Sequence, residues 1–177
     1  MRLIVCAGNG EKFGFASAIG VGMVQSAINL TQILSKKLPN EIIFVGTAGL
    51  YSEGEILGIY ESKTAVNHEI SELFGYSYSP LKTALVSYET EKKNIVNSSN
   101  FITSNSEISA KFAALGYRLE NMEFHSVLSV AKHFKIPAYG IFCATNFCNE
   151  TAHEDFIKNH AAAKIQLEKY LKSKGLA

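Results

Sequence analysis

The chain contains few of several residue types, and each shortage excludes a class of function. It has no tryptophan, and among its 177 residues there are only two arginines, Arg2 and Arg118. Two arginines argue against a multi-arginine phosphate site within one chain. The formal net charge is +1, which provides no electrostatic footprint for nucleic acid or an acidic membrane. We therefore expect neither as a partner.

Long apolar runs and metal-binding spacings are also missing. No run approaches the roughly 18–20 apolar residues that span a bilayer, and residues 1–8 are too short for a secretory signal and predict a buried strand. Cys6, Cys143 and Cys148 lie in or just after apolar runs, with no metal-site spacing. We expect reduced thiols, a cytoplasmic location, and neither a metal nor an organic cofactor.

The composition is that of a globular protein. Hydrophobic residues make up 47% of the chain and charged residues 19%, so a packed core is expected and bulk disorder is not. The length suggests a single domain over residues 1–177. Strand-like and helix-like segments alternate, which predicts an α/β fold with a mixed, largely parallel central sheet flanked by helices.

Periodicity and punctuation place the individual elements. Strands are expected over residues 3–7, 13–19, 42–45, 55–63, 83–88 and 138–144. Helices are expected from residue 21 to the break at Pro39, from 104 to 115, from 122 to 134, and from 151 onward. The predicted apolar stripe of the first helix consists of Val24, Ala27, Ile28 and Ile33-Leu34. Ser104 and Thr151 have the spacing of capping boxes.

Polar side chains occur where these elements meet. Asn121 and Glu123 flank Met122 at the expected start of a helix, and Thr145-Asn146 ends the last apolar run. Polar groups at the mouths of consecutive βα units are typical of a site for a small polar ligand. A glycine-rich turn at Gly8 could also bring N–H groups to a phosphate or ribose, although an ordinary turn has the same sequence.

Four short motifs follow the order and spacing of one superfamily. They are Gly46-Thr47-Ala48-Gly49, Phe101-Ile102, Asn121-Met122-Glu123 and Thr145-Asn146. The chain resembles a short, divergent member of the purine nucleoside phosphorylase and methylthioadenosine/adenosylhomocysteine nucleosidase superfamily, closest in kind to a bacterial phosphorylase. The resemblance implies a nucleoside phosphorylase-like fold, a homo-oligomer (a dimer, or a hexamer as a trimer of dimers) and cleavage of the N-glycosidic bond of purine nucleosides.

The resemblance also implies roles for individual residues. Bond cleavage leaves positive charge on the ribosyl ring and negative charge on the base, so both must be held and stabilised. The implied catalytic residues are Asn146 and Glu123. The ribose would contact Glu123, Met122 and, as a weaker candidate, His68. The base would contact Phe101, Ile102, Asn121 and Asn146. The phosphate or nucleophile would face Gly8, Ser17, Thr47, Ala48 and Gly49.

Departures from the family pattern bear on the substrate and the nucleophile. Asn146 stands where adenine-cleaving members carry an aspartate, and an amide can donate to N7 or O6 of a 6-oxopurine, so inosine or guanosine is expected. The leading prediction is phosphorolysis to base and ribose 1-phosphate, with inorganic phosphate as co-substrate. Phe44 and Phe142 replace family arginines, which keeps two alternatives open. One is hydrolysis with Glu11 as the general base, and the other is binding of a nucleoside or base without catalysis.

Overall fold

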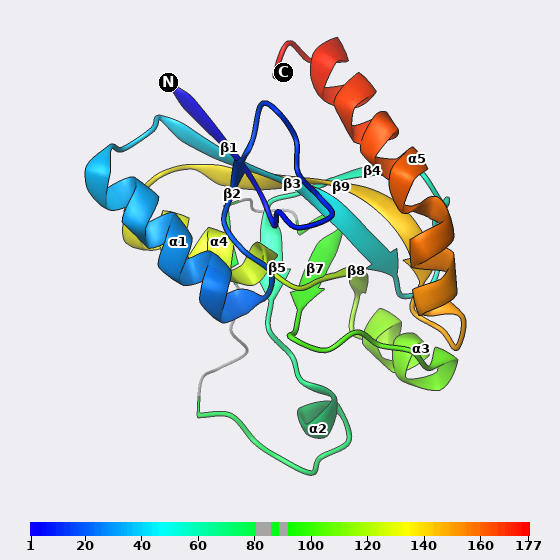
Figure 1. The fold of residues 1–177 in the computed structure, drawn as a ribbon. Helices are drawn as coiled ribbons and strands as arrows, with labels where there is room; N and C mark the ends of the chain where they lie inside the picture. The colour runs from blue at the N-terminus through cyan, green and yellow to red at the C-terminus, as the bar shows by residue number, and fades with distance from the viewer. Residues whose placement is uncertain (81–85, 89–91) are drawn as a thin grey trace.

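A computed structural model describes residues 1–80, 86–88 and 92–177 of the protein, and Figure 1 shows a central sheet with helices on both faces. The strands are β1 (Arg2–Cys6), β2 (Ser17–Ala18), β3 (Glu41–Leu50), β4 (Ile59–Ser62), β5 (Thr64–Val66), β6 (Val86–Ser87), β7 (Ile95–Ser98), β8 (Tyr117–Asn121) and β9 (Ala138–Phe147). The helices are α1 (Met23–Lys36), α2 (Ile70–Leu73), α3 (Ser106–Ala114), α4 (Phe124–His133) and α5 (Ala152–Ser173). None of these helices in the described ranges is long and apolar enough to cross a membrane.

β3 is the centre of the sheet. It pairs in parallel with β1 and with β9, and its last two residues pair antiparallel with β8. The order β2-β1-β3-β8-β7-β5-β6 continues to both sides, and β9 also pairs with β4. Parallel pairing joins β1 to β2, β5 to β7 and β7 to β8, while β4–β9 and β5–β6 are antiparallel. The predicted mixed, largely parallel α/β sheet is confirmed.

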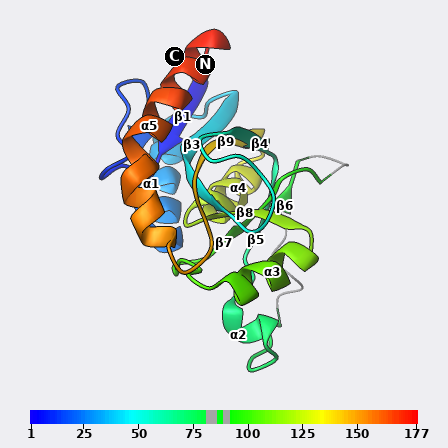
Figure 2. The same ribbon diagram turned by 90° about the vertical axis from the view of Figure 1, so that its right-hand side faces the viewer.

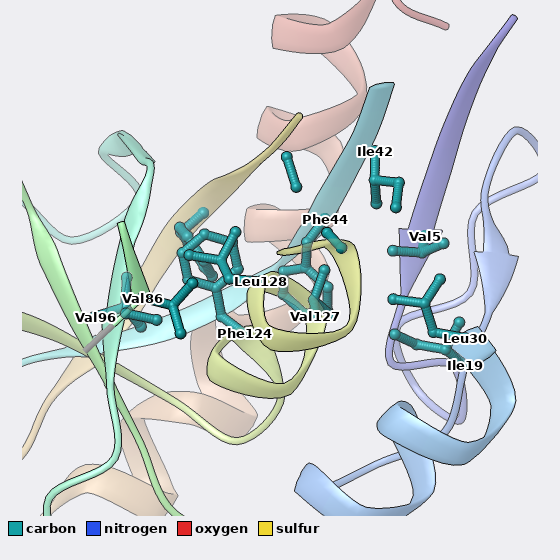
Figure 3. Close-up of a cluster of buried hydrophobic side chains, with 14 of the residues drawn as sticks. Val5, Ile19, Leu30, Ile42, Phe44, Val86, Val96, Phe124, Val127 and Leu128 are labelled. Atoms are coloured by element: carbon teal, nitrogen blue, oxygen red, sulfur yellow. The ribbon is translucent and has the colours of Figure 1, made fainter. Parts of the chain in front are cut away.

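Alternation along β3 divides the core between the two faces of the sheet. Ile42 and Phe44 join the cluster that includes Leu30 of α1 and Leu128 of α4 (Figure 3). The intervening Ile43 joins a second cluster with Ala163, Leu167 and Leu171 of α5. Figure 2, which is turned by 90° from Figure 1, also shows α5 lying along the sheet. Successive strand side chains point to opposite faces, so a continuous apolar run is what a strand covered on both sides requires.

The two phenylalanines that replace family arginines are part of this core. The rings of Phe44 and Phe142 lie 5.7 Å apart, and Phe124 of α4 packs edge-on to Phe142 at 5.0 Å. A Cβ at Gly140 would lie 2.5 Å from the Phe142 ring, so glycine makes room for the cluster. Both positions therefore contribute aromatic packing, and neither side chain provides a cation.

Several predicted strand boundaries were wrong. The strand expected over 13–19 is reduced to β2, because Phe13 and Phe15 stack on each other at 5.4 Å in the α5-side cluster. The strand expected over 55–63 begins only at Ile59, after Leu57 adopts a left-handed backbone (φ 66°). Of the strand expected from Thr83 to Tyr88, residues 83–85 lie outside the described part, and β6 covers Val86–Ser87.

The helix details also required correction. α1 buries Ser26, Leu30 and Leu34. Leu34 was part of the predicted stripe, whereas Val24 and Ile28 are 67% and 48% exposed, so the first half of that stripe was placed on the wrong face. Asn105, and not Ser104, caps α3, because its side chain accepts from Ile108 N. Thr151 precedes α5 but makes no side-chain cap, since its hydroxyl donates to Asp155.

Candidate functional site

The candidate site lies where β3 changes its strand partner. β1 pairs with β3 up to Phe44, and β8 pairs with it from Gly49, so on this side no strand faces Thr47. The side chains of Glu11 and Asn121 form hydrogen bonds with the Thr47 backbone in place of a neighbouring strand. Thr47 N donates to both carboxylate oxygens of Glu11 at 3.3 Å, and the Thr47 hydroxyl donates to Glu11 Oε1. Asn121 Nδ2 donates to Thr47 O at 3.2 Å, so the backbone of β3 is satisfied by the site itself.

The Gly46–Gly49 segment follows the strand predicted over residues 42–45, and it continues that strand within β3. Its glycines serve close approach. A Cβ at Gly46 would lie 3.0 Å from Glu11 Oε2, and one at Gly49 would lie 3.1 Å from Asn146 Nδ2. A larger residue at either position would displace a polar side chain, so the small residues allow the carboxylate and the amide to reach the strand.

A tight turn brings Glu11 back to the sheet. Gly8 has a φ of 87° and Asn9 a φ of 53°, both in the left-handed region. Glu11 N then donates to Gly8 O at 2.9 Å. A Cβ on Gly8 would also lie 2.8 Å from the Cβ of Ala18 in β2. Gly8, predicted on the phosphate side, therefore has a clear role in aiming Glu11.

Glu123 is a buried carboxyl group just before α4. Its side-chain Oε1 accepts a hydrogen bond from Gly22 N at 2.8 Å. Burial, partly offset by the Gly22 hydrogen bond and reinforced by the charge of Glu11, raises the pKa of Glu123 from 4.5 to about 7. A carboxyl group that titrates near neutrality at a buried site is a frequent mark of function.

Asn121 fixes the position of Glu123. Its Oδ1 accepts hydrogen bonds from Glu123 N at 2.8 Å and Phe124 N at 2.9 Å, at the start of α4. Together with the bond to Thr47, these contacts use the oxygen and one N–H of the amide. The helix predicted from Met122 begins instead at Phe124, because Asn121 ends β8. The contact of Asn121 with the base stays a prediction.

Asn146 is held in a defined orientation at the end of β9. The Thr145 hydroxyl donates to Asn146 Oδ1 at 2.9 Å, and Asn146 Nδ2 donates to Phe147 O at 3.0 Å. Asn159 of α5 donates to Thr145 O at 2.8 Å, so α5 supports this end of the site. The register places Asn146 opposite Gly49 of β3. One amide N–H then stays available for a ligand.

Other predicted site residues lie at the margin. Phe101 and Ile102 are 74% and 58% exposed. Their loop is tied to the start of α1, because Met23 N donates to Asn100 Oδ1 at 3.0 Å. Met122 is half-buried beside Glu123, and Ala48 continues β3 after Thr47.

Two predicted residues are placed apart from the carboxylates. Ser17 is exposed in β2, where it pairs with Val5 of β1. His68 contacts the Tyr117 hydroxyl at 3.2 Å and packs edge-on to Phe112 at 5.8 Å, on the α3 side of the sheet. Their predicted ligand contacts stay predictions.

Sequence reasoning missed two groups that contact the carboxylates. One is the backbone N–H of Gly22, which binds Glu123 across 101 positions of the sequence. The other is His160 of α5, whose Nε2 lies 3.9 Å from Glu11 Oε1. Neither carries a local signal, because a backbone N–H has no side-chain signature and a lone histidine in an amphipathic helix resembles any other.

Two cavities in the described part of the chain do not coincide with this chemistry. A cavity of about 380 Å³ is lined by Glu53, Lys93 and Arg118, and another of about 440 Å³ lies between Met1 and α1. Neither is lined by Glu11, Thr47 or Glu123. We identify the site from its coupled carboxylates and paired backbone, because volume alone provides no reacting group.

Comparisons with known proteins bear on this geometry. No protein-family model matches the sequence, and no curated protein matches it by sequence. Among solved structures, a futalosine hydrolase mutant of Helicobacter pylori strain 26695 has a TM-score of 0.82 at 16% identity, covering 97% of this chain and 96% of that chain. A putative 5′-methylthioadenosine/S-adenosylhomocysteine nucleosidase from Francisella philomiragia has a TM-score of 0.82 at 13% identity, with the same coverage. The corresponding enzyme of S. pneumoniae has a TM-score of 0.77 at 14% identity, covering 97% of this chain and 96% of that chain.

The protein therefore has the fold of the nucleoside phosphorylase and nucleosidase superfamily, as its motifs predicted. The prediction of a phosphorylase was wrong, because the structures it resembles are nucleosidases and a hydrolase. The geometry gives a physical reason. Glu11 occupies the N–H and hydroxyl of Thr47 that a phosphate would need, and its negative charge would repel that anion.

Proposed function

We propose that the protein is a purine nucleosidase, which hydrolyses the N-glycosidic bond with water as the nucleophile. The observation that carries this proposal is the Glu11 carboxylate, held on Thr47 and electrostatically coupled to the buried Glu123. A fixed carboxylate is suited to take a proton from water. The similarity to solved nucleosidases supports the same chemistry.

The proposed reaction assigns one task to each group. Glu11 takes a proton from a water molecule as the water oxygen bonds to C1′ of the ribose. The bond from C1′ to the purine breaks, and the base leaves with a proton taken up from solvent. Glu123 accepts hydrogen bonds from the ribose hydroxyls, where a bond to a charged group contributes about 1.5–3 kcal/mol. Asn146 donates to the departing base.

The residue at position 146 supports a preference for 6-oxopurines. An asparagine amide has no acidic proton to give to a base, but it can donate a hydrogen bond to N7 or O6. We therefore propose inosine or guanosine, or a nucleoside with the same base, as the substrate.

We also propose that a second copy of the chain covers one side of the site. Val21, Val24, Phe101 and Ile102 are exposed apolar residues. They border Gly22, whose N–H binds Glu123, and the two loops are joined by the bond from Met23 to Asn100. Exposed apolar side chains gathered beside a polar site are typical of an interface.

Isotope labelling tests the reaction. Purified protein is incubated with inosine, guanosine, adenosine and 5′-methylthioadenosine in phosphate-free water labelled with heavy oxygen, and both base and sugar are analysed. Release of base with labelled ribose supports the proposal, and Glu11→Gln should lower the rate by roughly 10²- to 10⁴-fold. Strict dependence on added phosphate, with ribose 1-phosphate as product, would overturn hydrolysis.

A second candidate is a binding protein without activity. The observation that favours it is Asn146, an amide that already bonds to Thr145 and to Phe147 O. This reading predicts that calorimetry detects hypoxanthine binding while none of the four nucleosides is cleaved. Turnover of any of them would exclude it.

A further inference from the structure

A histidine from the C-terminal helix approaches the proposed general base. His160 Nε2 lies 3.9 Å from Glu11 Oε1, and the two side chains are only 20% and 14% exposed. This nitrogen is buried and has no hydrogen-bond partner. An unpaired buried polar atom destabilises a fold, so the presence of this nitrogen beside a carboxylate calls for a physical reason.

The surroundings of His160 direct it towards the turn that carries Glu11. Its ring packs on Phe156 at 5.0 Å. On the other side, a Cβ at Gly10 would lie 3.3 Å from its Cε1, so glycine permits this approach. One helical turn later, Lys164 Nζ donates to Gly10 O at 3.1 Å. α5 thus contacts the turn at two consecutive positions of one face.

His160 also stands alone as a basic group beside this carboxylate. Within residues 1–80, 86–88 and 92–177, it is the one basic side chain paired with Glu11 within 4 Å. Phe44 and Phe142, which replace family arginines, are fully buried in the aromatic cluster. Glu123, the nearby acid, adds negative charge. Beside the N–H and hydroxyl of Thr47, the basic group that reaches towards Glu11 therefore comes from α5.

We propose that His160 is a positioning residue for Glu11. When a nucleoside is bound, its Nε2–H donates to Glu11 Oε1, the oxygen that already accepts from the Thr47 hydroxyl. With both side-chain donors on Oε1, Oε2 shares the Thr47 N–H at 3.3 Å and keeps a lone pair to take the proton from water. This inference rests on the proposed hydrolysis and adds a fourth residue to its machinery.

The first test separates catalysis from binding. For a nucleoside that the wild type cleaves, His160→Leu should lower kcat roughly ten-fold or more, the loss of a hydrogen bond to a charged group, and leave KM within about two-fold. His160→Gln, whose amide nitrogen can replace Nε2, should recover most of kcat. His153→Leu, at an exposed position of α5, is the matched control and should match wild type.

A double-mutant cycle tests the dependence on Glu11. In a Glu11→Gln background, His160→Leu should lower the residual kcat no further, because it acts through Glu11. An equal fold-loss in both backgrounds, or unchanged kcat in His160→Leu alone, overturns the inference while hydrolysis stands.

If the wild type cleaves no nucleoside, the proposed function fails, and unfolding in urea still tests the pairing. The shift in midpoint caused by His160→Leu should then differ between the wild-type and Glu11→Gln backgrounds. Equal shifts would overturn the pairing itself.

Discussion

Neutralising Glu123 is predicted to stabilise the protein at alkaline pH. Burial and the charge of Glu11 raise the pKa of this group from 4.5 to about 7 in the folded protein. At about 1.4 kcal/mol for each pH unit between the folded and unfolded values, ionised Glu123 costs the fold about 3 kcal/mol. Glu123→Gln removes the charge and keeps an oxygen that can accept from Gly22 N.

The sign of the pH dependence follows from proton linkage. Between the unfolded value of 4.5 and the folded value of about 7, the folded state binds more protons at Glu123 than the unfolded state does. The contribution of this group to stability therefore falls as pH rises through that window and is constant above it. Glu123→Gln should equal wild type near the lower limit and exceed it by about 3 kcal/mol at alkaline pH.

Urea unfolding of the two proteins at about pH 4.5, 6 and 8.5 measures this difference. Other titrating groups, including the buried Glu120, are common to both proteins and cancel to first order. Glu53→Gln, at an exposed position, is the control and should show no comparable gain. A difference independent of pH, or a wild type that is more stable at pH 8.5, would refute the reasoning.

The same substitution should weaken catalysis, since a bond from ribose to a charged carboxylate contributes about 1.5–3 kcal/mol, or roughly 10- to 150-fold in kcat/KM. A gain in stability with a loss of activity is the signature of a strained functional group. Unchanged kcat/KM would remove Glu123 from the proposed machinery.

Three further substitutions probe the surrounding residues. Asn146→Asp should raise kcat/KM for adenosine relative to inosine by roughly ten-fold or more, and an unchanged ratio would contradict the base preference. Glu120→Ala should lower the free energy of unfolding in urea by roughly 2–5 kcal/mol, because Glu120 accepts from the Tyr51 hydroxyl and Thr103 N, both at 2.9 Å; a cost below about 1 kcal/mol would contradict this. Gly46→Ala should lower activity and cost about 1–3 kcal/mol in urea, because its Cβ would crowd Glu11, whereas Gly14→Ala meets nothing within 4 Å and is the control.

The sequence predicted best the strands that are apolar on both faces. β3 and β9 follow from continuous apolar runs, and both are longer than expected because small and polar residues continue them. β7 and β8 were missed because Asn97 and Glu120 interrupt the apolar pattern. Both polar side chains are buried and hydrogen-bonded. Asn97 Nδ2 donates to the Tyr51 hydroxyl at 3.1 Å, and that hydroxyl donates to Glu120. A strand built around buried hydrogen bonds has no simple periodicity.

The site was predicted only in part, for a related reason. The motifs predicted Glu123 and Asn146 as site residues, whereas Glu11 lies outside them and entered only as the alternative general base. His160 is 149 positions from Glu11, and the contact exists only because α5 packs across the turn. The motifs led to the prediction of a phosphorylase because they record which residues are present. The charge around those residues depends on which elements pack together in the fold, and a motif does not record that.

The charge of the assembled site favours a neutral nucleophile. Glu11 and Glu123 add negative charge on one side of β3, and the aromatic cluster excludes the arginines that would balance it. An incoming phosphate would meet this field without a strong counter-charge, whereas water meets a carboxylate ready to accept its proton. His160 adds a donor to Glu11 without making the site strongly cationic. Burial, reinforced by the charge of Glu11, explains the raised pKa of Glu123 and the expected instability at high pH, and the same pair of acids supports the proposed choice of water over phosphate.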